Sequence, residues 1–248
     1  MNLIILQRHE VIDHTARLTD NRAKHIIRVL HCVVGDRIKV GVLHDRIGFG
    51  TITALQPKYP FMVEMTVTHD SPPPPKVPLD IVLALPRPIM LRRILSQVTA
   101  LGVGKVHIVN AARVEKSFWQ AGLVDEDAYM AYVISGLEQA IDTIPPKIFF
   151  HRKFKPFVED YLPGIADHYH YLVYAHPSSA RGVHLCIGPA QGKVLVAVGP
   201  EGGWLDYELD KFEEQGFCGF AMGARILKVD TAVVNIHGMI MAELEHCR

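Results

Sequence analysis

Long apolar runs, clustered cysteines and an excess of one charge are all missing from this chain of 248 residues. The four cysteines, Cys32, Cys186, Cys218 and Cys247, are isolated in the sequence, which favours reduced thiols and a cytoplasmic protein over a secreted disulfide scaffold. The apolar run near the amino terminus has only four residues, and no stretch approaches the ~20 residues that cross a bilayer. We therefore expect neither a signal peptide nor a membrane partner.

Charge of one sign is equally scarce, because 26 basic residues balance 26 acidic ones. This balance excludes the net positive field of a non-specific nucleic-acid binder. If the protein binds RNA, the sequence requires a local basic patch and recognition through shape.

The phosphate-binding motifs are absent too. No Gly-x-x-x-x-Gly-Lys-Ser/Thr, Gly-x-Gly-x-x-Gly or Gly-x-Ser-x-Gly pattern occurs, but the apolar run 194–198 leads into Gly199-Pro200-Glu201-Gly202-Gly203. In that loop Pro200 removes an amide donor and Glu201 would repel a pyrophosphate, which favours a neutral or cationic ligand. A plain strand-to-helix turn is the alternative for this loop alone. A second irregular loop, residues 222–228, follows the next predicted strand, and two such loops at adjacent strand ends indicate a ligand site.

A proline-rich segment, residues 72–78, divides the chain. Successive prolines favour a stiff extended spacer, with a docking motif as the alternative. In residues 1–71 we predict a helix with Ala23, Ile26, Ile27 and Leu30 on its apolar face, followed by strands at 37–42, 49–55 and 61–68.

Residues 79–248 alternate between strand and helix patterns. The predicted strands are 77–85, 106–109, 147–150, 171–175, 194–198 and 217–222, and the predicted helices are 88–101, 125–140 and 230–246. This alternation predicts an α/β fold in which helices cover both faces of a parallel sheet.

The first predicted helix also has a polar face with basic residues. Lys24, Arg28 and His31 recur at helical spacing, and further basic residues lie close to them in the sequence. Such a stripe is suited to RNA phosphates, although a solvated helix face explains it equally well. The RNA-binding candidates are Arg22, Lys24, His25, Arg28 and Arg37.

The two loops, read with their flanks, resemble a known family. Residues 199–208 follow the pattern GPEGG-Phe/Trp-x-x-x-Glu, and residues 222–232 read MGARILKVDTA. Both are similar to motifs of the 16S ribosomal RNA (uracil-N3)-methyltransferases of the SPOUT superfamily. Residues 25–30 with 34–36, Gln97 with 100–103, and Glu138-Gln139 resemble further motifs of the family in the same order, so the resemblance covers nearly the whole chain.

The resemblance implies a fold and an activity. Residues 1–71 are expected to form a PUA-like RNA-binding β-barrel, 72–78 a linker, and 79–248 a SPOUT methyltransferase domain with a carboxy-terminal trefoil knot. The implied enzyme transfers a methyl group from S-adenosyl-L-methionine to N3 of a uridine in 16S ribosomal RNA, without a metal, and its partner is that RNA or the small ribosomal subunit. It also implies a homodimer through the last helix, whose apolar residues are Val233, Val234, Ile236, Ile240 and Leu244.

Site residues follow by matching the motifs. The expected cofactor-binding residues are Leu172, Tyr174, Gly199, Pro200, Glu201, Gly202, Gly203, Met222, Gly223, Ile226, Leu227 and Thr231. Arg225 and Lys228 are candidates for stabilising the uracil anion or for binding phosphate, and Asp230 is a candidate base. Transfer itself depends on in-line placement of the methyl group.

The chain departs from the family pattern at two places that we expect on the substrate side. Lys228-Val229-Asp230 stands where Arg-Thr-Glu is usual, and residues 140–143 lack the usual Gly and Arg. We expect cofactor binding to be kept while the RNA target or the rate differs. A non-catalytic RNA- or ribosome-binding protein, or an enzyme for another nucleoside ligand, stays open. A histidine group, His168, His170, His176 and His184, matches no standard zinc spacing and is expected to be exposed.

Overall fold

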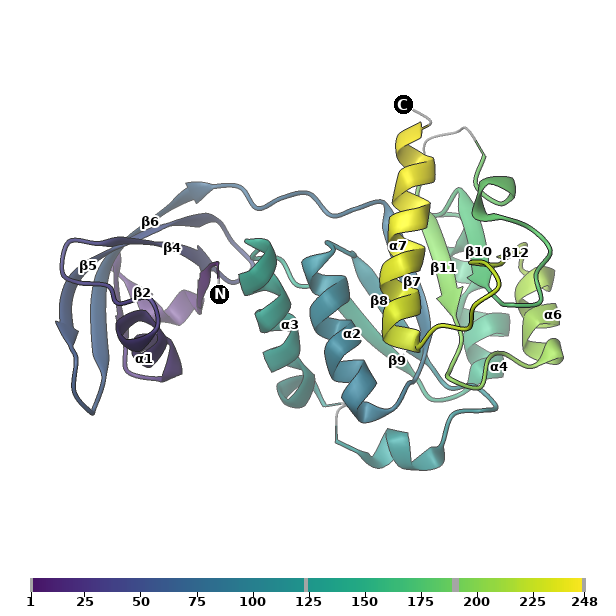
Figure 1. Cartoon of the computed structure of the whole chain (residues 1–248), viewed down its shortest axis with the longest axis horizontal. Coiled ribbons are helices and arrows are strands. Elements are labelled where there is room, and N and C mark those ends of the chain that lie inside the picture. The colour runs from purple at the N-terminus through teal and green to yellow at the C-terminus, as the bar shows by residue number, and fades with distance from the viewer. Residues whose placement is uncertain (1, 123–124, 189–191, 247–248) are drawn as a thin grey trace. The chain divides into compact units, whose positions relative to one another are not determined.

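The protein is represented by a computed structural model that describes residues 2–122, 125–188 and 192–246 (Figure 1). It divides into two compact units, one formed by Met1–Pro75 with Ile134–Pro145 and the other by Lys76–Val133 with Pro146–Arg248. The second segment of the smaller unit therefore comes from inside the range that we had assigned to the larger domain.

The smaller unit is built on a six-stranded sheet with the order β1-β4-β5-β6-β3-β2. β1 runs parallel to β4, and the other neighbours are antiparallel. The strands are β1 (Ile4–Leu6), β2 (Val11–Ile12), β3 (Thr15–Leu18), β4 (Arg37–Val42), β5 (Ile47–Gln56) and β6 (Met62–Ser71). The sequence predicted β4, β5 and β6 but missed the first three, which are too short to show a period.

Helix α1 (Asn21–Arg28) packs on this sheet. Asp20 caps it by accepting a hydrogen bond from the backbone N–H of Arg22 at 2.8 Å. Its buried residues, Ala23, Ile26 and Ile27, confirm the predicted apolar face. Leu30 lies beyond the helix and is 41% exposed, so it does not extend that face.

The segment 134–145 packs against the same sheet. Thr143 is fully buried, accepts a hydrogen bond from the His44 N–H at 2.9 Å and donates its hydroxyl to the Asp45 carbonyl. A Cβ on Gly41 would lie 2.5 Å from the Thr143 methyl group, so the strand needs glycine there. The departures at residues 140–143 therefore take part in the packing of the smaller unit, and their position on the substrate side stays a prediction.

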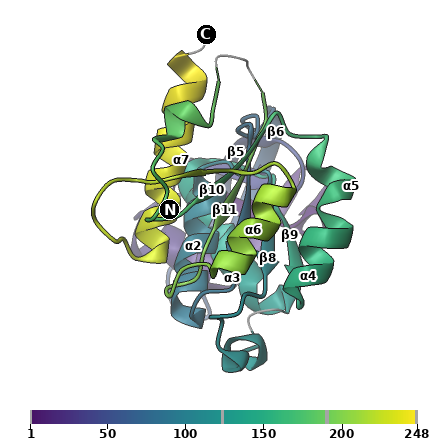
Figure 2. The ribbon, with the colours of Figure 1, turned by 90° about the vertical axis from the view of Figure 1, so that its right-hand side faces the viewer.

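The larger unit contains six parallel strands in the order β12-β10-β11-β7-β8-β9, which confirms the predicted α/β fold. Figure 2 shows α2 and α7 on one side of these strands and α4 and α5 on the other. The elements are β7 (Leu79–Ala84), α2 (Pro88–Ala100), β8 (Lys105–Val109), β9 (Lys147–His151), α4 (Phe154–Pro156), α5 (Pro163–Ala166), β10 (Tyr171–Ala175), β11 (Val194–Val198), α6 (Asp206–Glu214), β12 (Cys218–Phe220) and α7 (Val229–His246). Helix α3 (Glu126–Ala140) begins in this unit, and its residues from Ile134 on belong to the smaller one.

The apolar face of α7 belongs to the core of the larger unit. Val233, Ile236, Ile240 and Leu244 are all buried, and the helix packs against α2 and β11. Of the five residues that we had assigned to a dimer interface, only Val234 is exposed, at 39%. Burying this face within one chain is the simpler use of an amphipathic helix.

Two cysteines are paired, which corrects the expectation of reduced thiols. Cys186 and Cys218 form a disulfide across 32 positions of sequence, and Cys32 is free. The segment before Cys186 runs beside the end of β12, where the Ala221 N–H donates to the Arg181 carbonyl at 2.9 Å, and the two cysteine Cα atoms are 5.6 Å apart. Cys247 lies outside the described residues. No helix in the part of the chain that the structure describes is long and apolar enough to span a bilayer.

Candidate functional site

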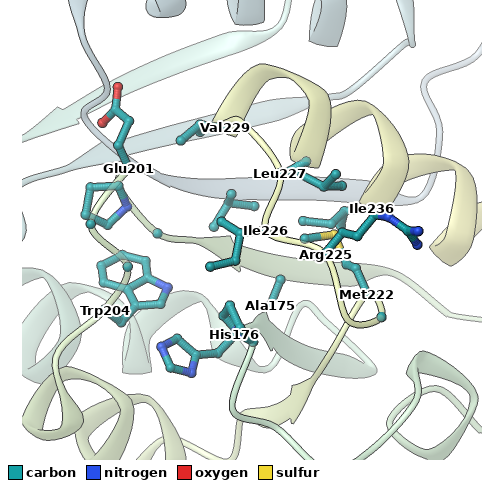
Figure 3. Close-up of a pocket in the computed structure, with 18 residues that line it drawn as sticks. Ala175, His176, Glu201, Trp204, Met222, Arg225, Ile226, Leu227, Val229 and Ile236 are labelled. Carbon is teal, nitrogen blue, oxygen red and sulfur yellow. The ribbon is translucent and has the colours of Figure 1, made fainter.

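A cavity lies where β10, β11 and β12 end (Figure 3). All three strands are parallel, so their carboxyl ends meet at one edge of the sheet, where α/β proteins bind ligands. The cavity has a volume of about 190 Å³. It is lined by residues 175–177, 198–204, 222–223, 225–227 and 229, and by Ala232 and Ile236 of α7.

The glycine positions of loop 199–203 leave little room for a side chain. A Cβ on Gly199 would approach the Trp204 ring to 3.2 Å, and one on Gly202 would lie 2.9 Å from Cδ of Arg113. Gly203 has φ of +75°, a region that favours glycine, and its N–H donates to the Pro200 carbonyl at 2.8 Å. The loop is therefore a tight turn whose backbone forms one wall of the cavity.

Trp204 forms the floor beneath this loop and is only 2% exposed. Its ring packs against Phe212 and Phe154, with centroid distances of 5.1 and 6.0 Å. The buried indole Nε1 has no hydrogen-bond partner among the described residues, and Figure 3 shows the indole beside Ile226 and His176. A buried donor without a partner is costly, and this one belongs to a residue that lines the cavity.

Glu201 lies at the rim, and its carboxylate is directed away from Trp204 (Figure 3). Its Oε1 accepts a hydrogen bond from the Arg87 N–H at 3.2 Å, at the amino end of α2. The helix dipole also favours a carboxylate there. From the sequence we expected this charge next to a neutral or cationic ligand, whereas the structure directs it to the helix.

The second loop contributes backbone and apolar side chains. Met222, Gly223, Ile226 and Leu227 line the cavity, and Ile226 is 84% exposed at its mouth. Within the described chain, the backbone N–H groups of residues 222–227 donate to no other residue. These irregular amides are available to a polar ligand edge. Arg225 lies in this loop too, but Figure 3 shows its guanidinium extending past Ile236, away from Trp204.

Three expected cofactor residues lie elsewhere. Leu172 packs against the core under the sheet, and Thr231 is exposed on α7 outside the cavity lining. The Tyr174 hydroxyl donates to Oε1 of Glu213 at 2.6 Å and lines a separate polar pocket with residues of α6. Burial and the Glu213 carboxylate raise the pKa of Tyr174 to about 12.

Two of the expected catalytic residues are outside the cavity lining as well. Asp230 is buried in the first turn of α7, where its Oδ2 lies 3.5 Å from Nη1 of Arg93 and its Oδ1 accepts the Thr231 N–H. Lys228 is exposed just before that helix. The structure thus brings together nine of the twelve expected cofactor residues, Gly199–Gly203 with Met222, Gly223, Ile226 and Leu227, and keeps Asp230 apart from them.

Two residues that our motif matching did not assign to the site contact the glycine loop or line the cavity. Arg113, which follows β8, donates to the Gly202 carbonyl. His176 follows β10, lines the cavity and has Nδ1 2.7 Å from the Ser178 hydroxyl. Burial lowers the pKa of His176, and the charge of Arg113 acts in the same direction. Their position directly after predicted strands was the available signal. Among the described residues, no three His, Cys, Asp or Glu side chains converge as metal ligands do.

Glu208 explains the last position of the GPEGG-Trp-x-x-x-Glu pattern. The residue is fully buried, and its two carboxylate oxygens accept hydrogen bonds from the Ala112 and Leu205 N–H groups, each at 2.8 Å. It therefore ties the loop after β8 to the start of α6. Sequence reasoning counted this glutamate as part of a motif but gave it no role.

In the smaller unit, Arg22 has little freedom to bind phosphate. Its guanidinium contacts the carboxylates of Glu10 at 2.5 Å and Asp20 at 2.7 Å, and it donates to the Ile5 carbonyl at 2.7 Å. These partners raise the pKa of Arg22 further despite its burial and lower those of both carboxyls. Its charge is already neutralised within the unit.

The other four RNA-binding candidates differ in exposure. Lys24 is exposed on α1, and His25 is half-buried with an unpartnered Nε2. The exposed Arg28 lies over the Phe61 ring at 5.5 Å, and the exposed Arg37 over the Phe49 ring at 4.4 Å. Lys24, Arg28 and Arg37 therefore present positive charge to solvent.

Comparison with known proteins gives consistent results. The RNA methyltransferase domain family matches residues 73–241. A ribosomal RNA small subunit methyltransferase E of Treponema pallidum is 31% identical over 98% of this chain and 91% of its own length. A ribosomal RNA small subunit methyltransferase E 1 of Borreliella burgdorferi is 23% identical over 94% of each chain. Among solved structures, a ribosomal RNA small subunit methyltransferase E of Neisseria gonorrhoeae bound to S-adenosyl methionine aligns with a TM-score of 0.74 and 19% identity, over 98% of this chain and 97% of that one.

Proposed function

Because this chain belongs to the ribosomal RNA small subunit methyltransferase E family, we propose that it transfers a methyl group from S-adenosylmethionine to N3 of a uridine in small-subunit ribosomal RNA. The observation that carries the proposal is the cavity between loops 199–203 and 222–227, with its partnerless amides and buried indole N–H. These groups suit a ligand that has a polar adenine edge and no phosphate.

The residues of the cavity fit this cofactor, which supplies an electrophilic methyl group on a sulfonium when bound. The N–H groups of residues 222–227 and Nε1 of Trp204 would donate to its polar atoms. Met222, Leu227 and Ile236 would cover its apolar surface. The glycines of the first loop let the backbone approach closely.

The acceptor nitrogen of uracil carries a proton that must leave, so a nearby cation would stabilise the anion that remains. We assign this role, or contact with the nucleotide's phosphate, to Arg225 and Lys228, which are both exposed next to the cavity. We do not extend the proposal to Asp230 as the base, because its carboxylate is paired with Arg93 and outside the cavity lining.

The finer features of the architecture are part of the same proposal. We assign a PUA-like barrel to residues 1–71, a linker to 72–78 and a trefoil knot to the carboxy-terminal part of 79–248. The alignment with the Neisseria structure over 98% of this chain supports one shared architecture. We also propose a homodimer through the exposed side of α7 around Val234, which light scattering of the purified protein would test. In the smaller unit, Lys24, Arg28 and Arg37 would contact RNA phosphates.

A methyl-transfer assay tests the proposed activity. The protein would be incubated with tritiated S-adenosylmethionine and small ribosomal subunits from a strain that lacks the corresponding gene, and mass spectrometry would then locate the label. We expect one methyl group on N3 of a uridine, and none on subunits from the parent strain. Calorimetry that shows no binding of S-adenosylmethionine, or transfer to a different atom, would contradict the proposal.

A further inference from the structure

Another hollow in the larger unit is lined by none of the residues that we assigned to the cofactor. This basic groove has a volume of about 630 Å³, within the range of roughly 300–1,000 Å³ for ligand sites. The side chains on which the argument depends are Lys116, Trp119, Lys153, Phe154, Lys155 and Tyr207.

The basic groove lies at the same edge of the sheet as the cavity. Lys116 follows β8, and Lys153 and Lys155 follow β9, so all three come after the carboxyl ends of parallel strands. The two hollows share a wall, because the rings of Phe154 and Trp204 are 6.0 Å apart. Glu208 also holds the groove in place relative to the cavity, because its carboxylate accepts a hydrogen bond from the N–H of Ala112, which lines the groove.

The charge of the groove is uncompensated. All the charged side chains that line it are lysines, and in the described parts of the chain none of them has a carboxylate within ion-pair distance. Other lysines of this unit are paired: Lys193 contacts Asp80 at 2.6 Å, and Lys211 contacts Glu214 at 2.7 Å. A chain with zero net charge thus has free positive charge concentrated next to its proposed cofactor.

Aromatic rings complete the groove. Tyr207 is 42% exposed, and its ring meets Phe154 edge-on at 6.2 Å, so it can present a face to a ligand. Trp119 is buried as a wall, held by a hydrogen bond from Nε1 to Asn110 at 2.9 Å and by the Arg152 guanidinium 5.3 Å over its ring. Free cations beside an exposed aromatic ring are what single-stranded nucleic acids bind.

We propose that the basic groove binds a single-stranded segment of the RNA substrate, with Lys116, Lys153 and Lys155 at its phosphates and Tyr207 stacked on one of its bases. The inference rests on the proposed function, since that function makes RNA the substrate. It requires a single strand because a base that reaches the neighbouring cavity must leave its helix. Lys116, Lys153 and Lys155 are therefore positioning residues that act on binding and not on the transfer step.

Fluorescence anisotropy with a labelled oligouridylate, without cofactor, tests the lysines. The Lys153→Gln/Lys155→Gln variant is compared with Lys105→Gln/Lys147→Gln, which removes equal charge at the amino ends of the same two strands, β8 and β9. We expect the slope of log affinity against log salt to fall by about 1.4 in the first variant, at roughly 0.7 for each lost phosphate contact, and to stay unchanged in the control. An equal fall of the slope in both double variants would show that only net charge matters, and it would overturn the proposal.

Tyr207 is tested by a second pair of variants. Tyr207→Ala should weaken oligouridylate binding by about tenfold, while Tyr207→Phe retains it, because stacking needs the ring and not the hydroxyl. Neither variant should alter the binding of inorganic polyphosphate, which has no bases to stack. An unchanged affinity of Tyr207→Ala for oligouridylate would refute the stacking role. Calorimetry with S-adenosylmethionine is run on every variant, so that failure of cofactor binding is seen separately from failure of the groove.

Discussion

The cavity and the basic groove lie at one edge of one sheet, yet their linings have opposite chemistry. The cavity is lined by glycine backbone, apolar side chains and the buried indole of Trp204, whereas the groove is lined by three unpaired lysines and aromatic rings. The first suits a cofactor without phosphate and the second suits a polyanion. The comparison shows how a chain with no net charge can bind RNA: three lysines gather in the groove, and among the described residues no carboxylate forms an ion pair with them.

The disulfide should affect the cavity and leave the groove intact. Cys218 begins β12, which leads into the loop 222–228. Cys218→Ser opens a closed loop of 32 positions, and we expect the free energy of unfolding to fall by about 3–4 kcal/mol, measured by guanidinium denaturation. Affinity for S-adenosylmethionine should fall with it, while oligouridylate affinity is retained. Cys32→Ser, at the free cysteine, is the control. A reductant that leaves the wild-type midpoint unchanged would contradict this prediction.

Gly199→Val should damage the cavity alone. Its Cβ would lie 3.2 Å from the Trp204 ring, and the valine methyl groups would extend further into that space. Overpacking of this kind costs about 1–3 kcal/mol. We expect a loss of S-adenosylmethionine affinity on the order of 30-fold by calorimetry, with unchanged oligouridylate binding. Gly164→Ala, where an added Cβ meets nothing within 4 Å, should behave as wild type. Normal cofactor affinity in Gly199→Val would remove this loop from the site.

Glu208→Gln should weaken both regions together. The carboxylate accepts the N–H groups of Ala112, which lines the groove, and of Leu205, which follows the glycine loop. A glutamine turns an NH₂ group toward one of these buried donors, which costs about 1–3 kcal/mol. Denaturation should show that loss, and both ligands should bind more weakly. Glu214→Gln, at an exposed ion pair with Lys211, is the matched control and should change stability by less than about 1 kcal/mol. If only one ligand is affected, Glu208 does not couple the two regions.

Much of the larger unit could be read from the sequence, because its strands are buried on both faces. Apolar runs such as 171–175 and 194–198 gave β10 and β11 with correct ends, and the glycines of loop 199–203 marked a close backbone approach. Periodicity also gave the buried face of α7 but not its neighbours. The family resemblance led us to assign that face to a dimer interface, whereas in this chain it packs in the core. The amphipathic pattern is the same in both cases.

What the sequence could not supply was contact between distant segments. The Arg22 side chain stands in a basic stripe, but the fold brings it to Glu10, 12 positions earlier, as well as to its sequence neighbour Asp20. The same holds for Cys186 with Cys218, and for the packing of Thr143 beside Gly41. Lys116 is more than thirty positions from Lys153 and Lys155, and it joins them only because β8 and β9 end side by side.

The smallest expected effect is a loss of folding stability at low pH. His107 lies on β8 and is fully buried, with its Nδ1 3.2 Å from Nε2 of His151 at the end of β9. Burial, with the charge of His151, lowers the pKa of His107 to about 3. Below the unfolded pKa of about 6.5 the unfolded chain therefore binds more protons than the folded one, so stability falls as pH decreases toward the folded pKa.

At pH 5.5 this linkage should remove about 1.4 kcal/mol of stability relative to pH 8, measured by urea denaturation. In His107→Phe the new ring would stack on Phe149 as the imidazole does. The stability of this variant should therefore fall by about 1.4 kcal/mol less than that of the wild type over the same pH range. His9→Phe, far from this pair in sequence, is the control and should keep the wild-type pH dependence.

Because His151 lies just before the segment that bears Lys153 and Lys155, acid should loosen the groove before the cavity. Oligouridylate affinity would therefore decline at a higher pH than cofactor affinity. If oligouridylate affinity and cofactor affinity decline at the same pH, the groove and the cavity unfold as one unit. The two regions would then differ in the chemistry of their ligands but not in stability.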